Sequence, residues 1–395
     1  MNVSKPLWIT LLACSRLGAA PEPLPIGSPA PAFDLPGFTV IQRDGQPTTV
    51  ETRYSLQSFA DARILALIFT CNHCPTAQAY EERIMQLAAD YQAKGVAMVC
   101  VTSNDPRAVR LDELGYTDLG DSYEDTKLRA RRRGFNFPYL YDGDEQAMAN
   151  AYGPAATPHV FIFDEARKLR YRGRIDNSED PGNIKEQEAR TALDALLAGR
   201  TPQVTTTRTF GCSLKWASKR DSAKAAFARW NQEEVTLDPA GPSDIAALVQ
   251  NETEKLRLIN VWATWCAPCA AEFPDLVELH RMYRGREFEL VSISVDALRR
   301  EAQSLAFLTK HAASFRNVIF ASEDRDALAE ALDPSWTGAL PYTLLVAPGG
   351  KIIYRHTGII DPLEFKQIIV GYLGRYFFET TPKLPGSVGQ GIGKK

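Results

Sequence analysis

The chain has 395 residues, a length that suits two or three domains, each with its own hydrophobic core. Its 45% hydrophobic residues and formal charge of −3 are typical of globular proteins, and they favour neither nucleic acid nor a charged membrane surface as a partner. No apolar stretch approaches the roughly 20 residues of a membrane-spanning helix, so we expect no transmembrane segment.

The first residues of the chain have the composition of an export leader. Lys5 precedes a short apolar run at 7–13, and Leu11-Leu12-Ala13-Cys14 resembles a bacterial lipobox, in which Cys14 becomes the lipid-modified first residue. The small residues at 18–20 could instead serve a conventional signal peptidase. We therefore expect an exported protein, periplasmic or anchored outside the cytoplasm by a lipid, with a cytoplasmic protein as the alternative.

Two Cys-x-x-Cys pairs each follow an apolar run and precede a segment with helical periodicity. Cysteines three apart on a first helical turn are close enough for a disulfide. The first of them faces free backbone N–H groups and the positive end of the helix dipole, which favour its thiolate. The pattern predicts two reversible redox centres. The pairs are Cys71 and Cys74, after the run at 64–69, and Cys266 and Cys269, after the run at 258–262.

A structural zinc site is the main alternative for four paired cysteines. Zinc ribbons usually place the second pair about 15–20 residues after the first, whereas Cys74 and Cys266 lie far apart. Attachment of a haem needs a histidine directly after the second cysteine, and Pro75 and Ala270 hold those places. We therefore expect thiol–disulfide chemistry with no metal and no cofactor, and inert buried cysteines remain as a further alternative.

The two pairs belong to two copies of one sequence pattern. A proline follows each pair, and the residues after the two prolines agree at constant spacing. The distance from the cysteine pair to the proline is longer in the first copy than in the second. We therefore expect extra residues between them in the first copy, around 111–122. Because the copies are long, they indicate a duplicated domain and not a short-period solenoid. The matching residues are Pro158 with Pro341, Lys168 with Lys351, Tyr171 with Tyr354 and Arg172 with Arg355.

Each copy predicts the same order of elements. An apolar strand leads into the cysteine helix, a second buried strand and a further helix follow, and two strands joined by a turn come between the proline and a last helix. This order predicts an α/β fold with a mixed central sheet and helices on both faces. The predicted helices include 75–93 and 184–197 in the first copy and 268–283 and 363–373 in the second; the second strands are 96–101 and 288–295.

These elements divide the chain into five expected segments. A leader at 1–25 precedes a first domain at 26–200, and a second domain spans 234–376. The segment between them, 201–233, carries Gly-Cys-Ser-Leu-Lys-Trp and is too apolar and aromatic to be only a flexible linker. The prolines and glycines of 377–395 predict a disordered tail.

The residues of both copies resemble known families. The run Asn-Val-Trp-Ala-Thr-Trp-Cys-Ala-Pro-Cys that ends at Cys269, with Glu272-Phe273-Pro274 after it, resembles the TlpA/ResA type of thiol–disulfide oxidoreductase. The first copy is similar to the AhpC/TSA-related redoxins, often called peroxiredoxin-like. The resemblance implies two thioredoxin-like domains in tandem and places the Cys212 segment on the first. The segments similar to the redoxins are 27–31, 69–75, 103–106, 157–159 and 211–216.

We expect the two cysteines of each pair to act in sequence. The first, Cys71 or Cys266, should be exposed and nucleophilic and should attack a partner disulfide, giving a mixed disulfide. The second, Cys74 or Cys269, lies one turn deeper and resolves that intermediate.

The resemblance also implies a cis-proline beside each dithiol. Pro158 and Pro341 hold these places, and X–Pro is the one linkage in which the cis form costs little. The residues before them, Thr157 and Leu340, would then present backbone groups to an extended substrate.

Several further side chains are candidates for supporting roles. Thioredoxin has a buried acid on the strand before its first cysteine, where this chain has Asn260, so Glu272 is the expected proton acceptor for Cys269, as in the ResA-like branch. A protonated His73 could stabilise the Cys71 thiolate. Cys100 lies in an apolar strand and is expected in the core. Cys212 is either a third redox partner of the first pair or a packing residue.

The predicted function is disulfide exchange with protein thiols, as a reductase supplied by an upstream thiol donor. The redox direction, the client and the donor are not specified by the sequence. We also expect that Cys266 can attack an oxidised first pair, directly or through Cys212. One alternative makes the first domain a docking module only.

Peroxidase activity of the first domain is the other alternative. Peroxiredoxins need Pro-x-x-x-Thr-x-x-Cys. Counting back from Cys74 gives Cys71 in place of the threonine and Leu67 in place of the proline, and counting from Cys71 gives Ile68 and Ile64. Neither alignment contains the required residues.

Overall fold

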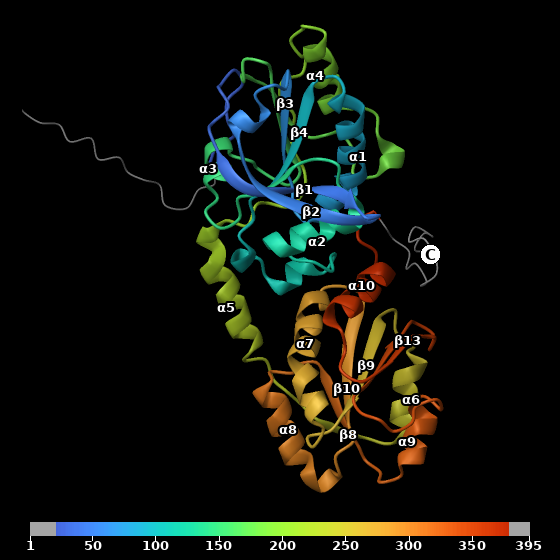
Figure 1. The fold of residues 1–395 in the computed structure, drawn as a ribbon. Helices are drawn as coiled ribbons and strands as arrows, with labels where there is room; N and C mark the ends of the chain where they lie inside the picture. Colours follow the sequence, from blue (N-terminus) through green and yellow to red (C-terminus); the bar gives the residue numbers. More distant parts are fainter. Residues whose placement is uncertain (1–20, 379–395) are drawn as a thin grey trace, which may run out of the picture.

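The computed structural model describes residues 21–378 and contains two α/β units (Figure 1). The expected leader up to residue 20, with Cys14, and the expected tail from residue 379 lie outside the described residues. Helix α5 (Arg220–Trp230) runs along the side of the molecule from the first unit towards the second. None of the helices between residues 21 and 378 is long and apolar enough to cross a membrane.

The first unit is built on a seven-stranded sheet in the order β2-β1-β5-β4-β3-β6-β7. Strand β3 pairs parallel with β4 and antiparallel with β6, so the sheet is mixed as predicted. The hairpin of β1 and β2 at one edge was not predicted. The strands are β1 (Asp34–Arg43), β2 (Gln46–Ser55), β3 (Ile64–Phe69), β4 (Val96–Thr102), β5 (Tyr139–Tyr141), β6 (His159–Phe163) and β7 (Leu169–Gly173).

Helices cover both faces of this sheet because strand β3 is apolar on both sides. Ile64, Ala66 and Ile68 belong to a core with residues of α1, α2 and α4, whereas Leu65 and Leu67 alternate with them and belong to a core with residues of α3. The helices are α1 (Pro75–Gln92), α2 (Tyr123–Arg133), α3 (Ala147–Tyr152) and α4 (Glu188–Leu197). Helix α4 begins four residues later than predicted, after a 3-10 turn at Pro181–Asn183.

The second unit has a six-stranded mixed sheet in the order β13-β12-β9-β10-β11-β8. Its central strand β9 is entirely buried and leads into the long helix α7. The strands are β8 (Asp238–Ala240), β9 (Leu256–Trp262), β10 (Phe288–Ser294), β11 (Arg316–Phe320), β12 (Tyr342–Val346) and β13 (Ile352–Thr357). The helices are α6 (Pro242–Gln250), α7 (Ala267–Tyr283), α8 (Glu301–Lys310), α9 (Arg325–Leu332) and α10 (Pro362–Leu373).

Strand register relates the two units residue by residue. Phe69 in β3 pairs with His159, which directly follows the first proline, and Val261 in β9 pairs with Tyr342, which directly follows the second. Phe69 and Val261 are therefore equivalent positions. The parallel strands on the other side have corresponding positions: Phe69 pairs with Val101 in β4, as Val261 pairs with Ile293 in β10.

This register shows that our alignment of the two cysteine pairs is wrong. Cys74 lies five residues after Phe69, and Cys266 lies five residues after Val261, so these two cysteines are equivalent. By the same count Cys71 is equivalent to Ala263, and Ala77 is equivalent to Cys269. The first pair is thus displaced towards the strand by three residues, and only its second cysteine begins a helix.

The segment at 111–122, expected as an insertion, joins the two units. The hydroxyl of Tyr283, at the end of α7, donates to the carbonyl of Thr117 at 3.1 Å, and the Arg286 guanidinium donates to the carbonyl of Gly115 at 2.7 Å. Arg375 forms an ion pair with buried Asp118 at 2.7 Å. The first unit therefore contacts the C-terminal end of α7.

Two candidate thiol centres

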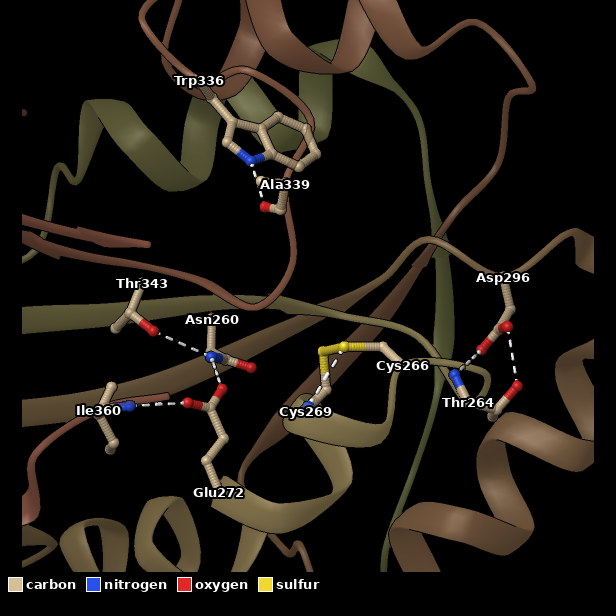
Figure 2. The surroundings of a disulfide bond; sticks show 10 residues. All are labelled: Asn260, Thr264, Cys266, Cys269, Glu272, Asp296, Trp336, Ala339, Thr343 and Ile360. Carbon is tan, nitrogen blue, oxygen red and sulfur yellow. Dashed lines mark hydrogen bonds between the residues drawn. A yellow bond between two sulfur atoms is a disulfide. The ribbon is translucent and has the colours of Figure 1, made fainter. Parts of the chain in front are cut away.

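The second centre lies at the N-terminus of α7 (Figure 2). Cys266 is the N-cap, and Cys269 lies in the first turn with its Cα 5.3 Å from that of Cys266, joined to it by a disulfide. The backbone N–H of Cys269 donates to the sulfur of Cys266 at 3.2 Å. Cys269 is fully buried, and Cys266 keeps 6% exposure beside Trp265, whose side chain is 59% exposed. Cys266 is thus less exposed than expected.

A buried aspartate holds the loop that precedes Cys266. Asp296 accepts hydrogen bonds from the backbone N–H of Thr264 at 2.9 Å and from its hydroxyl at 2.8 Å (Figure 2). Its carboxylate also accepts from the hydroxyls of Ser294 and Ser304. Asp296 has no local signal in the sequence, because it follows β10 and reaches the site only through the sheet.

Glu272 lies below the disulfide and is fully buried (Figure 2). One carboxylate oxygen accepts from the Asn260 amide at 2.8 Å, and the other accepts from the backbone N–H of Ile360 at 3.1 Å. Burial raises the pKa of Glu272 to about 7, and these two hydrogen bonds only partly oppose it. Within the described chain, no hydrogen bond joins this carboxylate to Cys269, so any proton transfer to Cys269 needs a side-chain movement or a bridging water.

Both expected prolines form cis peptide bonds, Thr157–Pro158 and Leu340–Pro341. In the second unit the loop before Pro341 is held by Trp336, whose indole N–H donates to the carbonyl of Ala339 at 2.8 Å (Figure 2). Leu340 is half-buried, and within the described chain its backbone makes no hydrogen bond outside this loop.

The first centre is arranged differently around its helix start. Cys74 is the N-cap of α1, followed by Pro75, and its sulfur accepts from the backbone N–H of Ala77 at 3.5 Å. Cys71 lies in the loop before the helix and is 3% exposed, whereas Cys74 is fully buried. The prediction that Cys71 faces the free N–H groups of the first helical turn is wrong, because three residues separate it from the helix start at Pro75. The prediction that Cys71 is exposed is also wrong.

The thiolate-favouring surroundings belong to Cys74. Its sulfur accepts a further hydrogen bond from the backbone N–H of Cys212 at 3.2 Å. Burial alone would raise the pKa of Cys74, but hydrogen bonds from the thiols of Cys212 and Cys71, the charge of His73 and the Ala77 N–H together hold it well below its usual value. For Cys71 the balance is opposite: burial and the neighbouring Cys74 raise its pKa, and only the Thr157 hydroxyl, 3.2 Å away, lowers it.

A buried ion pair supplies the positive charge at this centre. The His73 Nδ1 lies 2.5 Å from a carboxylate oxygen of Asp121, and both side chains are almost fully buried. Burial by itself lowers the pKa of His73, but the carboxylate outweighs it, so the pKa is raised; the same contact lowers the pKa of Asp121. The expected effect of a protonated His73 is therefore found on Cys74 and not on Cys71.

Asp121 also fixes the loop between the cysteines. It accepts from the backbone N–H of Asn72 at 2.8 Å and of His73 at 3.1 Å, and Asn104 donates to it at 2.8 Å. Asp121 comes from the segment at 111–122, which we expected to be an insertion, and no local signal in the sequence connects it with the cysteines. Cys71, His73 and Asp121 offer metal-ligand atoms within 4.8 Å of one another, but the His73–Asp121 hydrogen bond already uses two of these groups.

Cys212 lies against the first pair. Its carbonyl accepts from the backbone N–H of Thr157 at 2.9 Å, and the two residues form an antiparallel bridge. The expectation that Thr157 presents this N–H to a substrate therefore fails, because the chain's own segment uses it. Cys100 lies in β4 and is fully buried in the core, as predicted.

The two centres lie apart in this arrangement. Cys266 begins α7, whereas Tyr283 at the other end of that helix contacts the first unit. A helix of 17 residues is about 25 Å long. The expected attack of Cys266 on the first pair, directly or through Cys212, would therefore need the two units to move relative to one another.

The chain is similar to proteins of known families. The family model described as Redoxin matches residues 25–193 and 242–368. The chain is 32% identical over 148 residues to a protein named thiol:disulfide interchange protein DsbE homolog of Paracoccus denitrificans, covering 36% of this chain and 75% of that protein. It is 28% identical over 100 residues to the thiol-disulfide oxidoreductase ResA of Bacillus subtilis, covering 25% of this chain and about half, 51%, of that relative.

Solved structures are similar to parts of the chain. An uncharacterized conserved protein from Geobacillus kaustophilus is 35% identical, with a TM-score of 0.40, and the match covers 50% of this chain and 95% of that one. A hypothetical protein from Sinorhizobium meliloti is 31% identical, with a TM-score of 0.41, and the match covers 51% of this chain and 99% of that one.

Proposed function

Since the chain belongs to the redoxin family and is a thiol–disulfide oxidoreductase, we propose that it exchanges disulfides with protein thiols at two centres and that its second centre acts as a reductase. The second centre is Cys266 with Cys269, and the first is Cys71 with Cys74. The boundaries proposed for the units that carry them are 26–200 for the first domain and 234–376 for the second, with 201–233 between them.

The second centre has the geometry for attack on a protein disulfide. A thiolate at Cys266 attacks one sulfur of the client, which forms a mixed disulfide and releases the other client sulfur as a thiolate. Cys269 then attacks the Cys266 sulfur, which forms the Cys266–Cys269 disulfide of this structure and releases the second client thiol. The client gains two electrons, and an external dithiol must restore the centre.

The observation that carries this proposal is the position of Cys266 as the N-cap of α7. Its sulfur faces the first backbone N–H groups of the helix, which stabilise negative charge there. Exposed Trp265 next to it offers an apolar contact for a client. The backbone of Leu340 makes no hydrogen bond between residues 21 and 378, so it could pair with an extended segment of the client.

The reductase direction is supported by the unequal charge at the two centres. A positive charge on His73 stabilises the Cys74 thiolate, which favours the dithiol form of the first centre and makes its disulfide a better oxidant. At the second centre Glu272 adds a negative charge above pH 7, which opposes thiolate formation. The second centre should therefore be the stronger reductant.

Trapping of the mixed disulfide tests this proposal. The C269S variant cannot resolve the intermediate, so it should accumulate a covalent adduct between Cys266 and a disulfide-bonded client such as insulin. The C266S variant should form no adduct at Cys269, which is fully buried. An adduct that forms equally in both variants, or in neither, would contradict the assignment.

The expected export is part of the proposal and has its own test. The lipobox-like residues before Cys14 support a lipid-anchored protein outside the cytoplasm. Mass spectrometry of the native protein should then show a chain that begins at Cys14 with added acyl mass. An intact N-terminus in the cytoplasmic fraction would refute export.

A further inference from the structure

We propose that Cys212 is a third redox-active thiol of the first centre, which exchanges with Cys74 to form a Cys74–Cys212 disulfide and brings that disulfide to the surface. The proposal deepens the proposed function and needs the first pair to be redox-active. It gives the first centre a route to partners that its buried cysteines lack.

Strand register leaves Cys74 without the partner that Cys266 has. The place of Cys269 is held by Ala77, whose backbone N–H contacts Cys74 as the N–H of Cys269 contacts Cys266. Any partner for Cys74 must therefore come from elsewhere in the fold. Two cysteines do pack near it. Cys71 lies in the same small buried cluster as Cys74, and Cys212 packs against that cluster with its backbone N–H 3.2 Å from the Cys74 sulfur.

The chain holds Cys212 firmly in this place. Leu214 is buried in the core on one face of the first sheet, and Trp216 packs against the same core. The backbone N–H of Lys215 donates to Asn104 at 2.8 Å, and its carbonyl accepts from the N–H of Asp105 at 2.9 Å. Upstream, residues 205–207 pair with β7 at Arg172.

A glycine permits the close approach of this segment to the cis-proline loop. A Cβ on Gly211 would lie 2.0 Å from the carbonyl oxygen of Thr157, and its φ of +129° is one that other residues rarely adopt. With Gly211 in place, Cys212 pairs with the Thr157 backbone as an extended substrate would. The segment thus occupies the substrate position of the first unit and places a thiol there.

Exposure distinguishes the three sulfurs. Cys71 is 3% exposed and Cys74 fully buried, whereas Cys212 is half-buried between the exposed residues Gly211 and Ser213. A protein thiol from outside can therefore reach Cys212 before it reaches the other two. Because thiol–disulfide exchange depends on access to the attacked sulfur, Cys212 is the point of entry for electrons.

The reaction consists of two thiol–disulfide exchanges, after which the oxidised partner is released. The Cys212 thiolate attacks the Cys74 sulfur of the Cys71–Cys74 disulfide, the Cys74–Cys212 bond forms, and Cys71 leaves and takes up a proton, with no net change in oxidation state. A thiolate of a partner dithiol then attacks the Cys212 sulfur, and Cys74 leaves as the thiolate that His73 stabilises. A low pKa makes Cys74 a good leaving group.

Release completes the transfer of two electrons. The second thiol of the partner attacks the partner sulfur that is bonded to Cys212. The partner becomes a disulfide, Cys212 leaves and takes up a proton, and the first centre is left with three reduced cysteines. The partner is a protein dithiol that can contact the surface around Gly211 and Ser213.

Oxidation of the full chain with Cys71→Ser tests the bond directly. Oxidised glutathione is added, free thiols are alkylated, and peptides are mapped by mass spectrometry. The expected product links Cys74 to Cys212. Persistence of a glutathione adduct on Cys74 with Cys212 alkylated, in a protein with an unchanged circular dichroism spectrum, would overturn the proposal.

A kinetic experiment tests the route. In the wild type, the oxidised Cys71–Cys74 pair is reduced with a bacterial thioredoxin as the dithiol probe, and Cys212→Ser should slow this reduction at least 10-fold. Reduction of Cys266–Cys269 in the same molecules is the internal standard, and Cys100→Ala is the matched control. An unchanged rate in the Cys212→Ser variant would overturn the proposal.

The outcomes separate this inference from the proposed function. If the wild-type Cys71–Cys74 pair never forms a reversible disulfide, the function proposed for the first centre fails. If that pair forms normally and neither the Cys74–Cys212 bond nor the rate effect is found, only the role of Cys212 fails. Gly211→Ala keeps all three thiols but displaces the segment, and it should slow the reduction as Cys212→Ser does.

Discussion

The two thiol centres occupy equivalent places in two similar sheets, yet their surroundings differ in charge and exposure. Exposed Trp265 precedes Cys266 in the second unit, and buried His73 precedes Cys74 at the equivalent position in the first. Both cysteines are N-caps, so both gain the same help from a helix N-terminus. The fold therefore determines where the thiol lies, and the neighbouring side chains determine how stable its thiolate is.

The charged side chains around the two thiol centres differ in sign, and they come from different segments of the two units. In the second unit Asp296 holds the loop before the cysteine, and by strand register Asn104 takes its place in the first. There the carboxylate is instead Asp121, which the insertion supplies and which pairs with His73. Glu272 has Tyr80 as its equivalent, so the buried acid of the second centre has no counterpart there. The neighbouring side chains thus favour the thiolate at the first centre and, where Glu272 is ionised, oppose it at the second.

The largest effect is expected from removal of Cys266, the proposed nucleophile of the second centre. Cys266→Ser should lower the rate of insulin reduction by about 10³-fold or more, because the remaining Cys269 is fully buried and cannot attack a client. The rate is measured by the precipitation of reduced insulin. Cys100→Ala is the matched control, and a rate within twofold of wild type in C266S would remove the second centre from the reaction.

Breaking the buried ion pair should have the next largest effect. Asp121→Asn leaves His73 without its counter-charge and should lower the free energy of unfolding of the first unit by about 3 kcal/mol, measured by urea denaturation. Alkylation of Cys74 should also require a higher pH, because His73 is then neutral at pH 7.

Asp296, the carboxylate that holds the loop of the second unit, provides the control. Asp296→Asn removes hydrogen bonds but no charge at the first centre, so it should leave the pH profile of Cys74 alkylation unchanged. Identical Cys74 profiles in D121N and wild type would show that the ion pair does not stabilise the thiolate.

Glu272→Gln should change how the second unit responds to pH. The pKa of about 7 in the folded protein lies above the ordinary value of 4.5, so between these pH values the folded state keeps a proton that the unfolded state has lost. The contribution of Glu272 to the free energy of unfolding therefore falls as pH rises through this window, by up to about 3 kcal/mol. Relative to wild type, the variant should gain stability from pH 5 to pH 8.

The same variant tests the effect on catalysis. Removal of the charge that develops near pH 7 should flatten the pH dependence of Cys266 alkylation after reduction, and superimposable curves for variant and wild type would separate Glu272 from the thiol chemistry. Glu278→Gln is the control, because Glu278 is half-buried on the same helix and its carboxylate pairs with Lys366.

The smallest effect is expected at the client surface. Trp265→Ala should raise the KM for insulin about 5- to 10-fold, which corresponds to about 1 kcal/mol of lost contact. The rate with a small disulfide should change little, because such a substrate does not reach the indole. An equal loss with both substrates would place Trp265 in the chemistry and not in docking.

Much of the fold could be predicted from local pattern. The buried strands, the cysteine helices and the hairpins after the prolines follow from apolar runs and turn residues, and α1 ends within one residue of its predicted limit. Glu272 was also found by its helical spacing from Cys269. Its burial against Asn260 is consistent with the interpretation that it replaces the acid of that strand.

The errors concern contacts that join distant parts of the chain. The two Cys-x-x-Cys motifs look alike, and only strand register shows that Cys74, not Cys71, matches Cys266. A signal was present, since Pro75 marks the helix start directly after Cys74. Asp121 had no such signal, because an insertion places it beside His73. The approach of Cys212 likewise depends on Gly211 and on pairing with Thr157.

The central claim is that the two centres differ in reduction potential because of their neighbours. The wild-type protein is equilibrated in a series of glutathione or dithiothreitol buffers, and the oxidised fraction of each pair is measured by differential alkylation and mass spectrometry in the same sample. We expect a less negative midpoint potential for the first centre, whose Cys74 thiolate is stabilised, than for Cys266–Cys269. Equal potentials, or a more negative potential at the first centre, would contradict it.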